Sequence, residues 1–291
     1  MNCRIAIGDF CCGLNFSDSD IQGAAARYYN RYVCGRTPDI TIDVEIVHKQ
    51  ALELPESILD LKTVSGSSFN FCDGLIEGEW DIEKSVVRVY VPRQLLRERI
   101  RLFEQFLMEV YYTWLMLAQV QLQSFGCLVH ACGAVRHGFG YIFTGPSGSG
   151  KSTVANMVRC GHVLNDEIVL VRFNRKHFEV LSTPFTGSYR EKQSMSSPLK
   201  SVFFLVHSKQ NRVRAINSID AALEFIKQVI VCRPLVSTDF AEMRRNISDL
   251  ALQLVSQVGF YRLFFTKDER VWVSVDSLFD TSKYTQIEEA L

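Results

Sequence analysis

The segment Gly145–Ser152, with the sequence GPSGSGKS, matches the pattern G-x-x-x-x-G-K-[ST] at every fixed position. In this pattern the glycines let successive backbone N–H groups turn toward phosphate oxygens, and the N-terminus of the following helix adds partial positive charge. Lys151 can reach the β- and γ-phosphates of a nucleoside triphosphate, and the Ser152 hydroxyl is placed to coordinate Mg²⁺. We therefore expect a nucleoside triphosphate and Mg²⁺ to bind at Gly145, Ser147, Gly148, Ser149, Gly150, Lys151, Ser152 and Thr153.

A pair of acidic residues follows at Asp166 and Glu167, the first of them fourteen residues after Ser152. The pair lies between the apolar segments 163–164 and 168–171, which places it at the end of a strand beside the phosphate-binding loop. There the two carboxylates could hold Mg²⁺ directly or through water, and one could accept a proton from an attacking hydroxyl. The alternative is a turn between two strands, in which the dipeptide Asn-Asp is common.

The elements around the loop read as strand, loop and helix, which is the order that a phosphate-binding loop requires. An apolar strand at 141–144 runs directly into the glycines, and a helix is expected over 153–158. The segments 261–265 and 271–275 read as a closing hairpin. Further strands are expected at 127–129, 134–135, 163–164, 168–173, 178–181 and 202–206, with helices near 218–231 and 239–257.

The first 120 residues predict a smaller α+β region. Apolar residues three and four positions apart, from Leu96 to Leu117, predict a long core helix over 92–123. Because burial alone explains such a stripe, we assign no chemistry to it. The other expected elements are strands at 3–8, 40–46 and 86–91, a helix over 21–33, and short strands within 69–80 that Gly74 and Gly78 interrupt.

The sequence around the loop resembles the catalytic domain of HPr kinase/phosphorylase and its wider family, which is related in fold to phosphoenolpyruvate carboxykinase. The resemblance implies an α/β fold, with an HPr-kinase-like P-loop domain of mixed β-sheet and flanking helices over 125–291 and the smaller α+β region over 1–124. It rests on HACGAV at 130–135, GFG at 138–140, TGPSGSGKST at 144–153, LNDE at 164–167, TPFTG at 183–187 and PLKSVFFL at 198–205.

The resemblance also implies a Mg-ATP-dependent kinase that transfers the γ-phosphoryl group to a hydroxyl, namely that of a serine. Asp166 matches the first acid of the family's Asp-Asp pair and is the expected base, while His130 matches a histidine near the transferred phosphate. Lys151 completes the expected catalytic set, and Ser152, Asp166 and Glu167 are the expected metal ligands. At the position of the family's second Asp this sequence has Glu167, whose longer side chain extends the reach of the carboxylate. Without the resemblance, a lone histidine at a strand end is more often structural.

A second departure lies after residue 187, where SYREKQSMSSPLK lacks the Gly-rich signature with which true HPr kinases bind and dephosphorylate their protein substrate. We therefore expect neither phosphorylation of HPr nor phosphorolysis. Relatives of this shorter type imply free serine or a serine of a small peptide as the acceptor. Arg190 and Lys192 are candidates for a phosphate contact, or for a solvated basic surface.

The alternative function is an ATP-binding accessory protein of a peptide-modification or regulatory system, with little or no phosphotransfer.

The composition narrows the class of partner. Thirty-two basic and thirty-two acidic residues cancel, so no global field favours nucleic acid or a membrane surface. The apolar run at 106–120 contains Glu109 and falls short of the roughly twenty residues that a membrane span needs. No C-x-x-C pair is found among the nine cysteines, and the N-terminus lacks a secretory pattern, which predicts reduced thiols in the cytoplasm. The expected partners are a nucleotide and a hydroxyl acceptor. The sequence leaves open whether the chain forms a homo-oligomer.

Overall fold

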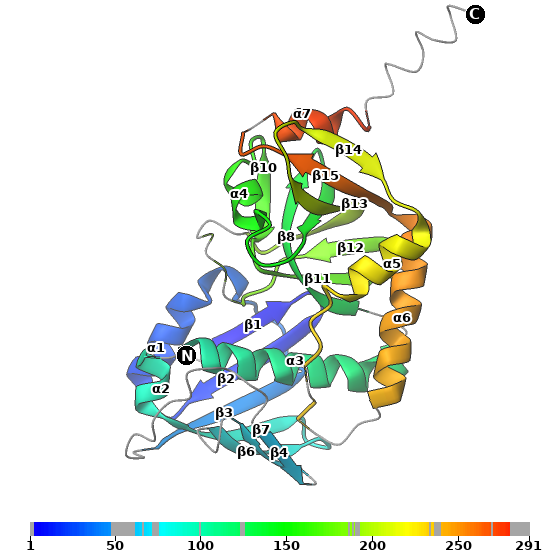
Figure 1. Cartoon of the computed structure of the whole chain (residues 1–291). Coiled ribbons are helices and arrows are strands. Elements are labelled where there is room, and N and C mark those ends of the chain that lie inside the picture. Colours follow the sequence, from blue (N-terminus) through cyan, green and yellow to red (C-terminus); the bar gives the residue numbers. More distant parts are fainter. Residues whose placement is uncertain are drawn as a thin grey trace, which may run out of the picture.

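The computed structural model describes residues 3–47, 62–65, 67–71, 76–98, 100–122, 126–185, 187, 189, 193–232, 234–235, 240–268 and 270–279 of the chain. These residues form a mixed α/β protein with two sheets, and the long helix α3 (Ile100–Leu122) lies between them (Figure 1). No helix in these ranges combines the length and the apolar character needed to cross a membrane.

The first sheet is mixed and is built from the N-terminal part of the chain. Its strand order is β1 (Cys3–Ile7), β2 (Phe10–Phe16), β3 (Ile40–Val47), β7 (Val86–Pro92), β6 (Ile76–Asp81), β5 (Ser68–Phe71) and β4 (Lys62–Ser65). β2, β3 and β7 run parallel, and the other neighbours are antiparallel. Three helical segments accompany this sheet, α1 (Ser19–Tyr28), the 3₁₀ turn η1 (Asn30–Tyr32) and α2 (Arg93–Glu98). Asp18 caps α1 by accepting hydrogen bonds from the backbone N–H groups of Asp20 and Ile21.

Helix α3 joins the two sheets through its side chains. Phe103 and Phe106 are buried in a core cluster with residues of the first sheet, as the apolar stripe predicted. The same cluster contains Leu128, Leu170 and Phe185 from the second half of the chain. The helix is therefore covered by apolar side chains from both sides, and it is a core element shared by the two halves.

The second sheet closes on itself, because one of its strands pairs with a different neighbour in each half of its length. Residues 126–130 of β8 (Gly126–Arg136) pair with β11 (Ile168–Phe173), whereas residues 131–136 pair with β9 (Phe139–Thr144). The pairings β8–β11–β12–β13–β9–β8 form a closed ring, in which β9 and β13 are parallel. The remaining strands are β12 (Phe178–Leu181), β13 (Ser196–His207), β10 (Gly161–Asn165) beside β8, and β15 (Gly259–Phe265) and β14 (Arg212–Ala215) beyond β13.

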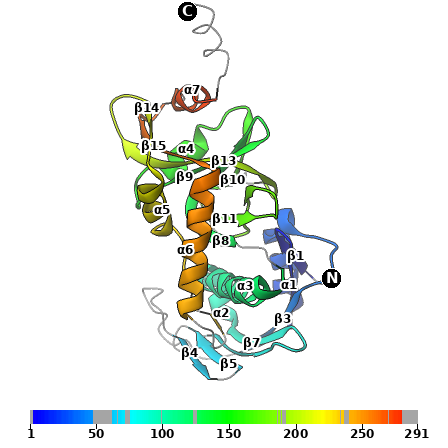
Figure 2. The ribbon, with the colours of Figure 1, turned by 90° about the vertical axis from the view of Figure 1, so that its right-hand side faces the viewer.

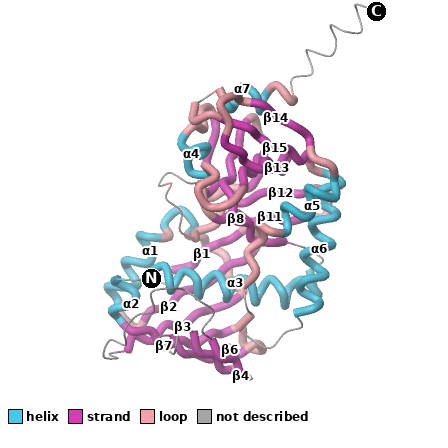
Figure 3. The backbone as a smooth tube through the Cα atoms, in the orientation of Figure 1, coloured by secondary structure: helices cyan, strands magenta, loops and turns pink. Residues whose placement is uncertain are grey.

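Helices lie on the outside of this second sheet (Figure 3). They are α4 (Lys151–Asn156), α5 (Ser218–Ile226), α6 (Phe240–Gln257) and α7 (Val271–Asp276). Helix α6 extends along the side of both halves (Figure 2). Its Met243 is buried with Tyr112 of α3 and with Cys232, so α6 is a second connection between the halves.

Several predicted elements need correction. The closing hairpin is wrong, because residues 271–276 form helix α7 rather than a strand. Val271, Val273 and Val275 lie two positions apart, as on one face of a strand. The spacing of four between Val271 and Val275 also fits a helix, which buries both of them with Trp272 and leaves Val273 67% exposed. Gly78 does not interrupt a strand but lies within β6, and Gly74 lies outside the described residues. The runs 127–129 and 134–135 belong to one strand, β8, and the sequence analysis missed β2, β4 and β14.

Candidate functional site

The glycine-rich segment forms the connection between β9, which ends at Thr144, and α4, which begins at Lys151. This is the strand, loop and helix order expected for the phosphate-binding pattern. Gly150 is the N-cap of α4 and has φ +104°, a conformation that L side chains rarely adopt. A Cβ atom here would lie 2.5 Å from Cζ of Phe265, so both the backbone conformation and the space require glycine.

Lys151 is 7% exposed and points back into the loop, where its Nζ donates hydrogen bonds to the carbonyls of Gly145 at 3.0 Å and Pro146 at 3.4 Å. Burial lowers the pKa of Lys151, and the nearby charge of Glu167 opposes that shift. The Ser149 hydroxyl is also buried, and its oxygen has no hydrogen-bond partner among the described residues. The loop therefore holds a partly desolvated ammonium and an unused buried hydroxyl, both of which fit a phosphate group.

Three parallel strands end beside this loop. β9, β13 and β15 run in the same direction, so their carboxyl ends at Thr144, His207 and Phe265 lie at one edge of the sheet. The Nε2–H of His207 donates to the carbonyl of Gly148 at 3.0 Å, and the His207 ring stacks on Phe265 with centroids 5.7 Å apart. Such an edge is where open α/β sheets bind ligands. The sequence analysis gave His207 no role, and only the pairing of distant strands brings it to the loop.

His130 and Glu167 meet next to the same edge. In the pairing of β8 with β11, His130 lies opposite Ile168, and Nε2 of His130 is 3.0 Å from Oε1 of Glu167. Both side chains are partly exposed, at 34% and 46%. Thr144, the last residue before the loop, donates its hydroxyl hydrogen to the His130 carbonyl at 2.8 Å. An imidazole in contact with an accessible carboxylate can accept or pass on a proton.

Asp166 lies in the same turn but is completely buried. Its Oδ1 accepts a hydrogen bond from the backbone N–H of Tyr189 at 3.0 Å. Gly187 lies so close that a Cβ atom there would be 2.2 Å from Oδ1 of Asp166. Burial, followed by the charge of Asp166, raises the pKa of the Cys132 thiol, and the charge of Lys151 opposes the shift. Cys132 therefore lies within electrostatic range of both predicted catalytic groups.

The Asn165 side chain holds this turn in place, a role that the sequence analysis did not assign. Its Nδ2 donates to the carbonyl of Phe185 at 2.9 Å and to the carbonyl and hydroxyl of Thr183, both at 3.2 Å. Its Oδ1 accepts from the backbone N–H of Glu167 at 2.9 Å and of Ile168 at 3.4 Å. Because Asn165 is fully buried, its amide is a rigid link between the acidic turn and the segment after β12.

A cavity of about 310 Å³ opens beside Glu167. One wall comes from helix α3, to which no chemistry was assigned, and the other from the acidic turn and the segment after β12. Within the α3 wall, Glu104 is only 4% exposed and accepts a hydrogen bond from the Tyr28 hydroxyl at 2.9 Å. The lining residues are Arg101, Glu104, Gln105, Met108, Glu167, Ile168, Phe185 and Gly187. The N-terminal part of the chain therefore completes a cavity at the predicted catalytic turn.

The predicted metal ligands fit a magnesium site to different degrees. In the described part of the chain, no group of three or more His, Cys, Asp or Glu side chains is arranged to hold a metal. Magnesium bound to a nucleotide needs only one or two protein ligands, since phosphates and water supply the others. Ser152 at the start of α4 and the half-exposed Glu167 fit this class, whereas Asp166 is covered by Gly187 and Tyr189. Arg190 and Lys192 lie outside the described residues.

Comparisons with known proteins place the chain in a family. No curated protein matches it. The family described as SynChlorMet cassette protein ScmC matches residues 103–280, which is more than half of the chain and includes the loop, the acidic turn and all of the α3 wall of the cavity except Arg101. The chain belongs to the ScmC family of SynChlorMet cassette proteins.

Proposed function

We propose that this protein is a cytoplasmic Mg-ATP-dependent phosphotransferase of the HPr-kinase-like type, which moves the γ-phosphoryl group of ATP to a hydroxyl. The proposal includes an HPr-kinase-like P-loop domain over residues 125–291, with the region 1–124 shaping the acceptor side. One observation carries it, namely that the loop with Lys151 and the contact of His130 with Glu167 lie at the same edge of the second sheet. A phosphate donor and a proton acceptor are needed side by side for this reaction.

The loop would bind the triphosphate. Lys151 would leave the carbonyls of Gly145 and Pro146 and contact the phosphate oxygens, and the buried Ser149 hydroxyl is available for a further hydrogen bond. When bound, Mg²⁺ would neutralise charge on the phosphates, with Ser152 and Glu167 as its protein ligands. This chain would act mainly by positioning and electrostatics, as is usual for phosphoryl transfer.

The acceptor hydroxyl would enter the cavity of about 310 Å³ beside Glu167. This volume is at the small end for ligand cavities, and it suits a serine as a free amino acid or as one side chain of a small peptide. Of the two acids, Glu167 lines the cavity, so Glu167 with His130 is better placed to take the proton in this conformation. Asp166, the base expected from the sequence, would serve only after Gly187 and Tyr189 move away from it.

The test is incubation of the purified chain with γ-labelled ATP and Mg²⁺, offering free serine, threonine and a pool of serine-containing peptides. We expect label on one acceptor, and no label with Lys151→Ala. Glu167→Gln and Asp166→Asn, compared at saturating ATP and Mg²⁺, then identify the base, because a variant that loses turnover while its affinities for ATP and for Mg²⁺ are unchanged has lost the proton acceptor rather than a metal ligand. Full turnover in both variants would remove both acids from that role.

The second candidate function is an ATP-binding accessory protein with little or no phosphotransfer. Two observations favour it: Asp166 is covered by the backbone of Tyr189, and Lys151 is turned toward the carbonyls of its own loop. For this candidate we expect a stoichiometric complex with ATP that depends on Lys151, and no label on any acceptor. A protein without affinity for ATP would contradict both functions.

A further inference from the structure

Two cysteines far apart in the sequence meet in the first sheet. Cys11 lies in β2, and Cys34 follows η1, in a segment that pairs with β1 through Ile5 and Val33. The Sγ atoms of Cys11 and Cys34 are 3.3 Å apart. Both residues are held against β1, since Cys11 pairs with Ala6 and the N–H of Cys34 donates to the carbonyl of Arg4 at 3.0 Å. The contact is therefore built into the sheet rather than made by two surface side chains.

The surroundings of the two thiols are different. Cys11 is 1% exposed, while Cys34 is partly exposed and is the one that a solute can reach. Burial raises the pKa of Cys11 to about 12, and the hydrogen bond with Cys34 adds to that shift. Burial also raises the pKa of Cys34, but hydrogen bonds from Arg36 and Cys11 outweigh it and leave the pKa below its ordinary value. Cys34 is thus the more reactive thiol, and Cys11 lies beside it in the position of a resolving cysteine.

We propose that Cys11 and Cys34 form a site of reversible oxidation, at which a hydroperoxide converts the two thiols into a disulfide. The sulfur of Cys34 attacks the peroxide, the O–O bond breaks, and an alcohol or water leaves while Cys34 becomes a sulfenic acid. The sulfur of Cys11 then attacks the sulfur of Cys34 and expels water, so two thiols and one hydroperoxide give one disulfide, one alcohol and one water. A dithiol reductant reverses the reaction by exchange.

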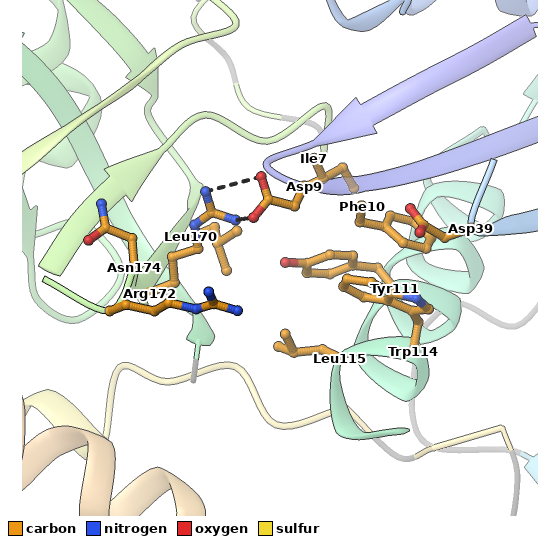
Figure 4. A pocket seen from close by; sticks show the side chains of 11 residues that line it. Ile7, Asp9, Phe10, Asp39, Tyr111, Trp114, Leu115, Leu170, Arg172 and Asn174 are labelled. Carbon is orange, nitrogen blue, oxygen red and sulfur yellow. Dashed lines mark hydrogen bonds and ion pairs between the residues drawn. The ribbon is translucent and has the colours of Figure 1, made fainter. Parts of the chain in front are cut away.

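The disulfide would act on the turn between β1 and β2. The guanidinium of Arg36, two residues after Cys34, donates to the carbonyls of Gly8 at 2.8 Å, Asp9 at 2.8 Å and Phe10 at 3.1 Å. From this turn Asp9 pairs with Arg172 of β11 in the second sheet at 2.7 Å (Figure 4). A cavity of about 350 Å³ lies beside this pair. Figure 4 shows Phe10, Tyr111 and Trp114 among the side chains that line it, and these three form an aromatic wall. Cross-linking Cys34 to β2 would therefore fix the turn that connects the sheets.

The test uses the whole protein and does not depend on nucleotide binding. The chain is treated with hydrogen peroxide in steps, alkylated, digested without reductant, and its cross-linked peptides are mapped by mass spectrometry. We expect one cross-link, between Cys11 and Cys34, that dithiothreitol removes, together with a rise in melting temperature of about 5 to 10 °C. The exposed Cys160 serves as the control, since it makes no thiol contact among the described residues and should be oxidised without a cross-link. Conversion of Cys34 to sulfinic acid without a cross-link, or pairing of Cys11 with Cys3 or Cys12, would overturn the proposal.

Single variants separate the two roles. Cys11→Ser should leave a sulfenic acid on Cys34 that dimedone traps, whereas Cys34→Ser should abolish both the cross-link and the trapped acid. Cys12→Ser, at a buried neighbour in the same strand, should leave the cross-link unchanged. Arg36→Gln should slow the oxidation of Cys34 several-fold, because the pKa of its thiol rises. If any of these variants fails to fold, the peptide map of the unmodified sequence still decides.

Discussion

The charge of Lys151 is the property of a single residue on which nucleotide binding would depend most. Burial lowers its pKa from an ordinary value of 10.5, so Lys151 loses its proton at a lower pH than an exposed lysine does. The protonated form is the one that attracts phosphate. The affinity for ATP should therefore be complete below this lowered pKa and should fall as the pH rises through it.

Titration of ATP binding by calorimetry between neutral and alkaline pH measures this effect. Lys151→Arg is the matched variant, because a guanidinium keeps its charge over the whole range. We expect a declining affinity for the natural chain and a flat profile, at lower affinity, for the arginine variant. A flat profile in both would show that the ammonium does not contribute to binding.

Asn165 carries a second prediction at the residue scale. Asn165→Ala removes five hydrogen bonds from a fully buried side chain, including those that its oxygen accepts from the backbone N–H groups of Glu167 and Ile168. We expect a loss of about 2–4 kcal/mol in the free energy of unfolding, measured with urea. Asn174→Ala, in a partly exposed turn where the side chain accepts from the N–H groups of Lys176 and His177, is the control and should cost less than about 1 kcal/mol.

Among the elements, the segment after β12 determines whether Asp166 is accessible. Gly187→Ala would place a Cβ atom 2.2 Å from Oδ1 of Asp166, so the segment must move away from the acid. We expect faster amide hydrogen exchange at Tyr189, whose N–H is bonded to Asp166, and faster phosphotransfer if Asp166 is the base. Gly35→Ala, where a Cβ atom meets nothing within 4 Å, is the matched control. Unchanged exchange at Tyr189 would show that the contact does not restrain the segment.

The order of elements near the loop could be predicted from the sequence, because each depends on residues close together in the chain. The glycines between Thr144 and Lys151 and the acids between β10 and β11 are local patterns. Contacts between distant residues could not be predicted. His207 reaches Gly148 only because β9 and β13 pair in parallel. One wall of the cavity beside Glu167 comes from α3, to which the apolar stripe had assigned only a role in the core. The thiol pair was missed for the same reason, since no spacing rule relates Cys11 to Cys34.

At the scale of the whole molecule, Arg172 links the two sheets and offers a contrast between an exposed and a buried partner. Its guanidinium pairs with Glu179 at 2.6 Å and with Asp9 at 2.7 Å, and the Glu179 side chain is 9% exposed whereas that of Asp9 is 76% exposed. Arg172→Met leaves the Glu179 carboxylate buried without its partner, so we expect a loss of about 3–5 kcal/mol. Asp9→Asn breaks only the exposed pair and should cost at most about 1 kcal/mol.

Urea unfolding of both variants, at low and at high salt, checks this contrast. High salt should weaken the contribution of Asp9 and leave that of Glu179 nearly unchanged, because buried pairs are screened less. Equal losses in the two variants would mean that the link between the sheets, rather than burial, determines the cost.

The position of α3 between the two sheets has a consequence for the synthesis of the chain. The strands of the first sheet are complete at Pro92 and α3 ends at Leu122, but Leu128, Leu170 and Phe185, which cover its other side, emerge from the ribosome later. The ring of the second sheet closes later still, when β13 reaches β9. During that interval the nascent chain exposes the apolar side of α3 to water, and chaperone binding competes with aggregation for this intermediate.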